Sequence, residues 1–156
     1  MTEGRQTEVW FYQLLRRRLE QVLPSLVERT RQRGWRAIIQ TATPERLSAI
    51  DDLLWTYAED SFLPHGAIKG GDPEMQPVFL TLGPENANAA RVRFLLEGVE
   101  AAPFVDQGYE RLIVLFDGRD EAFLANARAQ WKTLRQSNAD LAYWAETDEG
   151  GWQKQG

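Results

Sequence analysis

The sequence contains few of the side chains that perform catalysis, and their spacing forms no known catalytic arrangement. His65 is the only histidine, and there is no cysteine. Ser61 lies close enough in sequence for a small hydrolase triad with a nearby aspartate. However, the G-x-S-x-G turn is missing, and Pro64 beside His65 indicates a rigid turn. We therefore expect neither a catalytic site nor a metal site, because one histidine without cysteine is a poor zinc ligand set.

The glycines are also misplaced for a nucleotide cofactor. The first predicted strand, 9–14, continues into Leu15 and Arg16, where a dinucleotide-binding fold needs G-x-G-x-x-G. The glycine-rich stretch 66–71 includes Lys69, but it precedes a predicted strand, whereas a P-loop follows one. The pattern predicts a flexible loop there and no bound nucleotide.

A basic strip on the last predicted helix, 121–137, suggests a binding site. At 100° per residue, Arg128, Lys132 and Arg135 fall in a sector roughly 60° wide. Trp131 borders this sector and belongs to the apolar arc, which also contains Phe123, Leu124, Ala127 and Leu134. Such a surface suits an acidic peptide with one apolar side chain, because arginine can bind a carboxylate through two hydrogen bonds. Alternatively, the cations simply complement the negative end of the helix dipole.

An aromatic pair suggests a second binding surface. The helix predicted from Pro44 to about Tyr57 has a buried face formed by Leu47, Ala49, Ile50, Leu53 and Leu54. Trp55 lies outside this face, and the loop that follows brings Phe62 and Pro64. An exposed patch of this kind would mark a partner site. In the alternative interpretation, the loop folds back and covers Trp55.

Three consecutive arginines, Arg16 to Arg18, are a third candidate, because they could contact phosphates. The net charge of −5 argues against a general nucleic-acid-binding protein, which relies on a basic excess. A solvated start to a helix is the alternative for these residues.

The 156 residues suit one α/β domain, with an ordered core from about 8 to 147. Strands predicted at 9–14, 35–41, 77–82, 92–96, 111–116 and 141–144 alternate with helices at 19–33, 43–57 and 121–137. This order predicts a Rossmann-like, mostly parallel sheet flanked by helices. Pro24 predicts a kink or a helix start near Leu23, and the tail after Thr147 is expected to be frayed.

The segment Ile50 to His65, IDDLLWTYAEDSFLPH, resembles the chi subunit of bacterial DNA polymerase III. The family pattern there is L-D-x-x-L-W followed by S-F-x-P-H, with Ile50 in place of the leucine. Weaker matches include 11–12, 34–36, 77–78 and the last helix, so the resemblance covers about 9 to 144.

The resemblance implies a non-catalytic replication adaptor with two interfaces. Trp55, Phe62 and Pro64 would contact the psi subunit, which reaches the clamp loader. Arg128, Trp131, Lys132 and Arg135 would receive the acidic C-terminal tail of single-stranded-DNA-binding protein, which ends in phenylalanine. DNA would be reached only indirectly, through that protein. Leu124 departs from the family, in which a lysine can occupy this position.

The sequence also bears on the compartment. We expect no membrane segment and no signal peptide, because the apolar runs are only as long as strands and residues 1–8 lack an apolar core. A reducing cytoplasm is the expected location.

Overall fold

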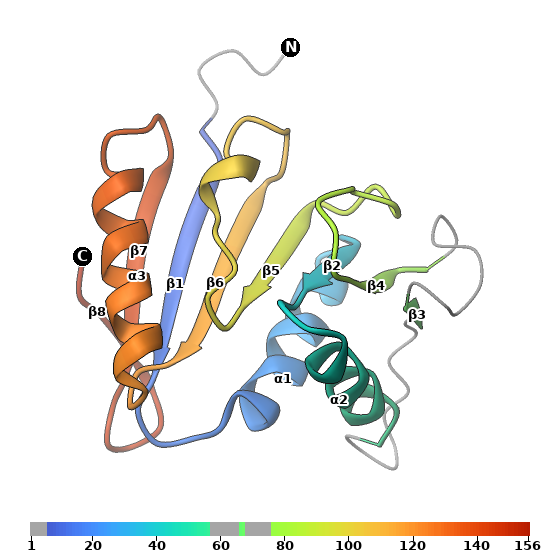
Figure 1. Ribbon diagram of the computed structural model, residues 1–156, viewed down its shortest axis with the longest axis horizontal. Helices are drawn as coiled ribbons and strands as arrows, with labels where there is room; N and C mark the ends of the chain where they lie inside the picture. Colours follow the sequence, from blue (N-terminus) through green and yellow to red (C-terminus); the bar gives the residue numbers. More distant parts are fainter. Residues whose placement is uncertain (1–5, 57–65, 68–75) are drawn as a thin grey trace.

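The protein is a single α/β domain built on one mixed sheet (Figure 1). The computed structural model describes residues 6–56, 66–67 and 76–156. Within these residues the sheet has eight strands in the order β3-β4-β2-β5-β6-β1-β7-β8, and only β8 runs antiparallel to its neighbour. The strands are β1 (Glu8–Leu14), β2 (Ala37–Gln40), β3 (Gly66–Ala67), β4 (Val78–Thr81), β5 (Val92–Leu96), β6 (Arg111–Asp117), β7 (Asp140–Glu146) and β8 (Trp152–Lys154). The predicted fold class is confirmed.

Three helices cover the sheet, α1 (Leu19–Gln32), α2 (Pro44–Thr56) and α3 (Glu121–Leu134), and a short 3₁₀ turn, η2, spans Ala102–Phe104. Local signals set their ends. The Thr43 hydroxyl accepts the Arg46 N–H at 3.2 Å ahead of Pro44, and Asp120 accepts N–H groups of the first turn of α3. Gly34 ends α1 with φ of +79°, a conformation that glycine adopts without strain.

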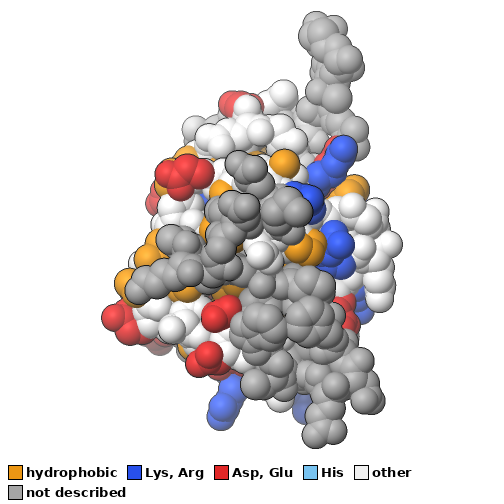
Figure 2. Space-filling view, turned by 90° about the vertical axis from the view of Figure 1, so that its right-hand side faces the viewer, with side chains coloured by type: hydrophobic (Ala, Val, Ile, Leu, Met, Phe, Trp, Pro, Cys, Tyr) orange, Lys and Arg blue, Asp and Glu red, His pale blue; other side chains and the backbone are white. Residues whose placement is uncertain are grey.

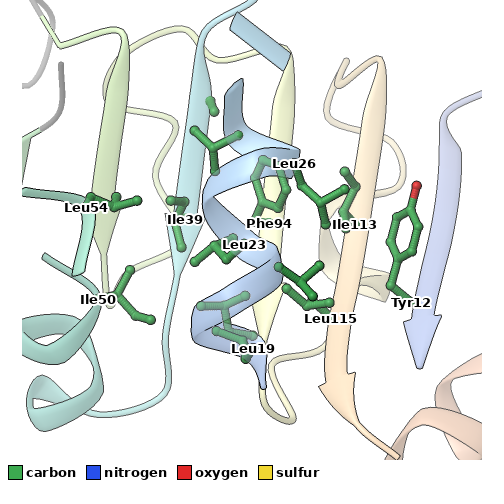
Figure 3. Close-up of a cluster of buried hydrophobic side chains, with 14 of the residues drawn as sticks. Tyr12, Leu19, Leu23, Leu26, Ile39, Ile50, Leu54, Phe94, Ile113 and Leu115 are labelled. Atoms are coloured by element: carbon green, nitrogen blue, oxygen red, sulfur yellow. The ribbon is translucent and has the colours of Figure 1, made fainter. Parts of the chain in front are cut away.

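Two hydrophobic cores lie on opposite faces of the sheet. Leu23, Ile39 and Phe94 belong to the core under α1 and α2, where Figure 3 shows the leucines of α1 above β5 and β6. Phe11, Phe116 and Ala127 belong to the core under α3. The alternation of β1 explains this division, because Phe11 points to one face and Tyr12 to the other.

The structure corrects several local predictions. Helix α1 begins at Leu19 rather than near Leu23 and continues through Pro24, which lies in its second turn. Ala49, expected on the buried face of α2, is exposed. The tail expected to be frayed after Thr147 instead turns back and forms β8, which pairs with β7. A turn closes that hairpin, since the N–H of Gly151 donates to the Thr147 hydroxyl at 3.0 Å.

Internal groups fill the position where this fold would hold a phosphate. In doubly wound sheets, ligands bind at the carboxyl ends of two adjacent strands whose connections leave in opposite directions along the sheet. Here these strands are β1, which connects towards β2, and β6, which connects towards β7. The N–H groups of Leu15, Arg16 and Arg17 all donate to Oε1 of Glu146, at 3.0, 2.7 and 3.0 Å. Consecutive N–H groups of this kind form an anion-binding nest. Glu146 therefore occupies the place of a ligand phosphate, and the nest is not available to a nucleotide.

The neighbouring loop closes the same edge from the β6 side. Arg119 donates to the carbonyl oxygens of Arg16 and Arg17, at 3.0 and 3.2 Å, and pairs with Asp117 at 2.8 Å. Gly118 packs so closely that a β-carbon there would lie 2.4 Å from Cγ of Gln13. The two loops thus contact each other directly where a nucleotide-binding protein has a crevice.

A fully buried arginine connects the sheet to the neighbouring loops through hydrogen bonds. Arg93 of β5 has 0 % exposure. Burial lowers the pKa of its guanidinium, and the interactions with Tyr109 and Glu85 partly offset that decrease. The guanidinium lies 4.1 Å from the ring centre of Phe104. Its N–H groups donate to oxygens of Gln40, Gly83, Glu85 and Tyr109.

We predict that Arg93→Ala lowers the free energy of unfolding by on the order of 3 kcal/mol or more, because it leaves buried acceptors unpaired and opens a cavity. Urea denaturation would measure this. Arg91→Ala is the matched control: its side chain is 60 % exposed, and we expect a change within about 0.5 kcal/mol. Equal stability of the two variants would contradict a structural role for Arg93.

Candidate functional site

An open groove of about 840 Å³ lies between α3 and the β7–β8 hairpin. Its floor comes from the end of β1 and from β7, and its walls come from α3 and from the chain after β8. The lining residues are Gln13, Leu15, Arg128, Trp131, Arg135, Tyr143, Ala145, Glu146, Gln153, Gln155 and Gly156. The groove therefore combines three segments that are far apart in the sequence.

Trp131 provides the apolar centre of the groove. Its half-buried indole packs edge-to-face on Phe11 and Tyr143, with ring centroids 5.4 and 5.5 Å apart. The chain after β8 approaches from the outer side, so that a β-carbon at Gly156 would lie 3.1 Å from Cζ2 of the indole. This packing holds the ring in one orientation while leaving part of it open to the groove.

Two of the predicted cations line the groove beside that ring. Arg128 and Arg135 are both exposed, one turn before and one turn after Trp131. Neither forms an ion pair with any residue that the structure describes. Lys132 is exposed as well but does not line the groove. The prediction of a water-accessible basic strip beside an indole is thus met by Arg128 and Arg135, with Lys132 at its margin.

Polar and apolar groups complete the floor. The Tyr143 hydroxyl donates to Oε1 of Gln13 at 2.6 Å. Burial raises the pKa of the Tyr143 phenol, and the nearby Arg128 cation opposes that rise. Leu15 is 39 % exposed, a high value for a large aliphatic side chain. The groove therefore offers an apolar surface next to two uncompensated positive charges.

The acidic residue at the end of the groove is internally neutralised. Burial alone would raise the pKa of Glu146, but hydrogen bonds from the Arg17 side chain and from the N–H groups of residues 15–17 lower it to about 2. Arg17 also donates to the carbonyl of Gly150 at 2.8 Å. The carboxylate of Glu146 is thus fully engaged, and its repulsion of an acidic ligand is offset by Arg17.

Comparison with known proteins identifies the family of this chain. A family model described as "DNA polymerase III chi subunit, HolC" matches residues 6–142. This chain belongs to the chi-subunit family of DNA polymerase III. A curated relative, "Probable DNA polymerase III subunit chi" from Rickettsia prowazekii (strain Madrid E), is 25% identical over 97 residues. That match covers 59% of this chain and 59% of the relative.

The family match ends before the outer wall of the groove. Residues 143–156, which include the end of β7 and all of β8, lie beyond the matched range. In this chi-family chain, Tyr143, Gln153, Gln155 and Gly156 nevertheless line the groove together with α3. Part of the groove lining therefore lies outside the matched range.

Leu124 is the position at which the sequence departs from the expected family pattern. Its side chain is half-buried and packs against the core under α3, and it does not line the groove. Leu124 therefore supports the packing of α3 and does not contribute to the groove surface.

The second predicted site is only partly described. Trp55 belongs to α2, but its side chain, Phe62 and Pro64 lie outside the described residues, as do Ser61 and His65. Figure 2 faces this side of the molecule, where charged side chains of both signs and hydrophobic ones border the region that is not described. The predictions for this site therefore stay predictions.

The arginine run divides into different roles. Arg17 forms an ion pair with Glu146, and its guanidinium carbon lies 5.7 Å from the ring centroid of Trp152. The side chains of Arg16 and Arg18, in contrast, are exposed. Elsewhere, no cluster of three potential metal ligands occurs among the described residues. No helix in the described part of the chain has the length and apolar character to cross a membrane.

Several groove residues could not be singled out from the sequence. Gln13, Leu15, Tyr143 and Glu146 resemble ordinary strand residues until the register of β1 and β7 places them side by side. Only the alternation of side chains along a strand pointed to part of this set, because it places Gln13 and Leu15 on the same face of the sheet as Phe11.

We predict that Glu146→Gln makes stability less sensitive to acid. The pKa of the carboxyl falls from 4.5 to about 2 on folding, so its stabilisation is complete above pH 4.5 and is lost as the pH falls towards 2. At about 1.4 kcal/mol per pKa unit, the variant should lose on the order of 3 kcal/mol at pH 7.

Thermal unfolding followed across this pH range would test the effect. Glu149→Gln, at an exposed position in the β7–β8 turn, is the matched control and should keep the acid dependence of the parent protein. An unchanged pH profile in Glu146→Gln would show that the nest does not depend on the charge.

Proposed function

We propose that this protein is a non-catalytic replication adaptor that binds the acidic C-terminal tail of single-stranded-DNA-binding protein and links it to the clamp loader. The observation that carries the proposal is the pair Arg128 and Arg135 beside the open indole of Trp131. Both cations are exposed and without an ion pair among the described residues. Membership in the chi family supplies the setting of the DNA polymerase III holoenzyme.

The chemistry of the groove suits such a tail. A terminal carboxylate can be held by a guanidinium through two hydrogen bonds, and aspartates before it can pair with the second arginine. A terminal phenylalanine can pack on Trp131, Tyr143 and Leu15. Because Arg17 offsets the charge of Glu146, the groove keeps its positive character in a protein of net charge −5.

The proposal assigns no chemical step to the chain. His65, the only histidine in the sequence, and Ser61 lie outside the described residues, so the structure does not test the hydrolase alternative, and the chi-family match argues against it. The crevice typical of the fold is filled by Glu146 and Arg119. Binding two partners at once raises their effective concentration, so moderate affinities are sufficient.

The second partner is proposed to be the psi subunit or another clamp-loader component. This part rests on the match to the family pattern at Trp55, Phe62 and Pro64. The end of α2 that carries Trp55 lies beyond β2, on the far side of the sheet from α3 (Figure 1). The two interfaces would then be separate, and both partners could bind together in the bacterial cytoplasm.

We predict that an acidic peptide ending in Pro-Phe binds the groove and that Arg128→Ala weakens it by on the order of 1–3 kcal/mol, as a charge-assisted contact would. Isothermal titration calorimetry at two salt concentrations would measure this, and higher salt should reduce the affinity. Arg33→Ala is the control, since Arg33 is exposed on the opposite side of the sheet. The absence of any binding heat, or an equal loss in the control, would refute the groove as the tail site.

We predict that Trp55→Ala abolishes co-purification with the psi subunit or another clamp-loader component while the fold stays intact, because one central tryptophan often carries much of an interface energy. Affinity capture combined with circular dichroism would test it. If the variant unfolds, Trp55 is a core residue. If capture is unchanged, the clamp loader binds elsewhere.

A further inference from the structure

One half of the sheet lacks a helix on the α1 side. Helix α1 contacts β2 and β6, and α3 packs on the opposite face. On the α1 side, β1, β7 and β8 carry no helix from the described part of the chain. Figure 3 shows Tyr12 on β1 standing beside α1 rather than beneath it.

Aromatic side chains cover this half instead. We name Trp10, Tyr12, Trp144 and Trp152 the aromatic face. Ring centroids are 6.1 Å apart for Trp10 and Trp144, and 4.8 Å apart for Tyr12 and Trp152. The three indoles are each half-buried, and Tyr12 has 8 % exposure. Their packing forms one continuous, partly open layer across three strands.

One polar group of the aromatic face has no hydrogen-bond partner. The indole N–H of Trp144 is buried and has no acceptor among the described residues. A buried donor without an acceptor costs stability.

Cations border the aromatic face at both ends. At one end, Arg111 lies 3.7 Å from the ring centre of Trp10 and 5.9 Å from that of Trp35. Arg33 lies 5.2 Å from the same Trp35 ring. At the other end, the exposed Lys154 pairs in register with Trp144.

The local charge is positive although the protein is acidic. Arg111 is paired with Glu8 at 2.9 Å, but Arg33 and Lys154 form no ion pair among the described residues. Burial raises the pKa of the Tyr12 phenol, and the nearby cations Arg111 and Arg29 oppose that rise. Two acidic groups, Glu8 and the exposed Asp140, lie side by side in register at the start of β1 and β7.

We propose that the aromatic face and its bordering cations bind single-stranded nucleic acid. Unpaired bases stack on indole rings and guanidinium planes, and phosphates pair with basic side chains. The strip from β6 to β8 crosses four strands at about 4.8 Å spacing, roughly 14 Å, which holds two or three stacked bases on other sheet platforms. A duplex, whose bases are already stacked, would not fit.

The overall charge of −5 predicts modest, salt-sensitive binding rather than tight binding. This proposal goes beyond the adaptor function and does not depend on it, because it uses the face opposite the groove. An adaptor that holds single-stranded-DNA-binding protein would be close to such strands.

The test is fluorescence anisotropy of a labelled short oligothymidylate at low salt, using the full chain. We expect saturable binding that weakens with salt, and weaker binding of the corresponding duplex. Lys154→Glu and Arg33→Glu, both exposed, should each reduce affinity severalfold and leave folding intact. Trp144→Ala should reduce it by about 5- to 150-fold, the range found when one stacking aromatic is truncated.

Arg128→Glu is the matched control, because it reverses a cation on the other face. It should abolish binding of the acidic peptide and leave oligothymidylate binding unchanged, whereas Lys154→Glu should do the opposite. Failure of the peptide assay alone would thus leave this proposal standing. No binding of the oligonucleotide, or equal losses in Arg128→Glu and Lys154→Glu, would overturn it. The proposal would also be overturned if the parent protein sediments as a dimer and the Lys154→Glu variant sediments as a monomer, because a second copy of the chain would then cover the aromatic face.

Discussion

The carboxylate of Glu146 holds together the part of the fold on which both binding surfaces depend. It accepts three consecutive N–H groups at the end of β1 and pairs with Arg17. These contacts fix the turn into α1, and they place β7 beside β1 at its carboxyl end. An internal anion thereby occupies the nest that related architectures use for a phosphate. The fold keeps the geometry of a nucleotide-binding sheet while its ligand position is filled by its own side chain.

The same hairpin contributes to two surfaces on opposite faces. The turn after Glu146 returns the chain as β8, whose alternating side chains divide between the faces. Trp152 joins the aromatic layer on the α1 side, whereas Gln153 lines the groove beside α3. Because a strand presents alternate residues to opposite faces, five residues of tail can complete two separate surfaces. Both surfaces are then tied to the stability of the β7–β8 pairing.

Ion pairing decides which of the many arginines are free to bind a partner. Arg17, Arg93, Arg111 and Arg119 are engaged by internal acceptors and position loops or strands. Arg33, Arg128 and Arg135 are exposed without an ion pair among the described residues. The net charge of −5 therefore does not predict the charge of any one surface, because some arginines are paired with acidic side chains and others are not. The Arg16 to Arg18 run illustrates this, because its middle member is structural.

The sequence alone determined the α/β class, the order of the three helices and of six of the eight described strands, and the basic strip on α3, because these follow from local periodicity, caps and residue spacing. It also excluded a nucleotide loop, since the required glycines are missing. Only the tertiary structure decided that the tail forms β8, that Glu146 fills the nest and that Tyr143 and Leu15 meet Trp131. The hydrogen bonds of Glu146 with residues 15–17, and the meeting of Leu15 with Trp131 in the groove, join residues more than a hundred positions apart. They depend on strand order and register, which local patterns do not encode, because the energy of pairing distant strands comes from packing across the whole sheet.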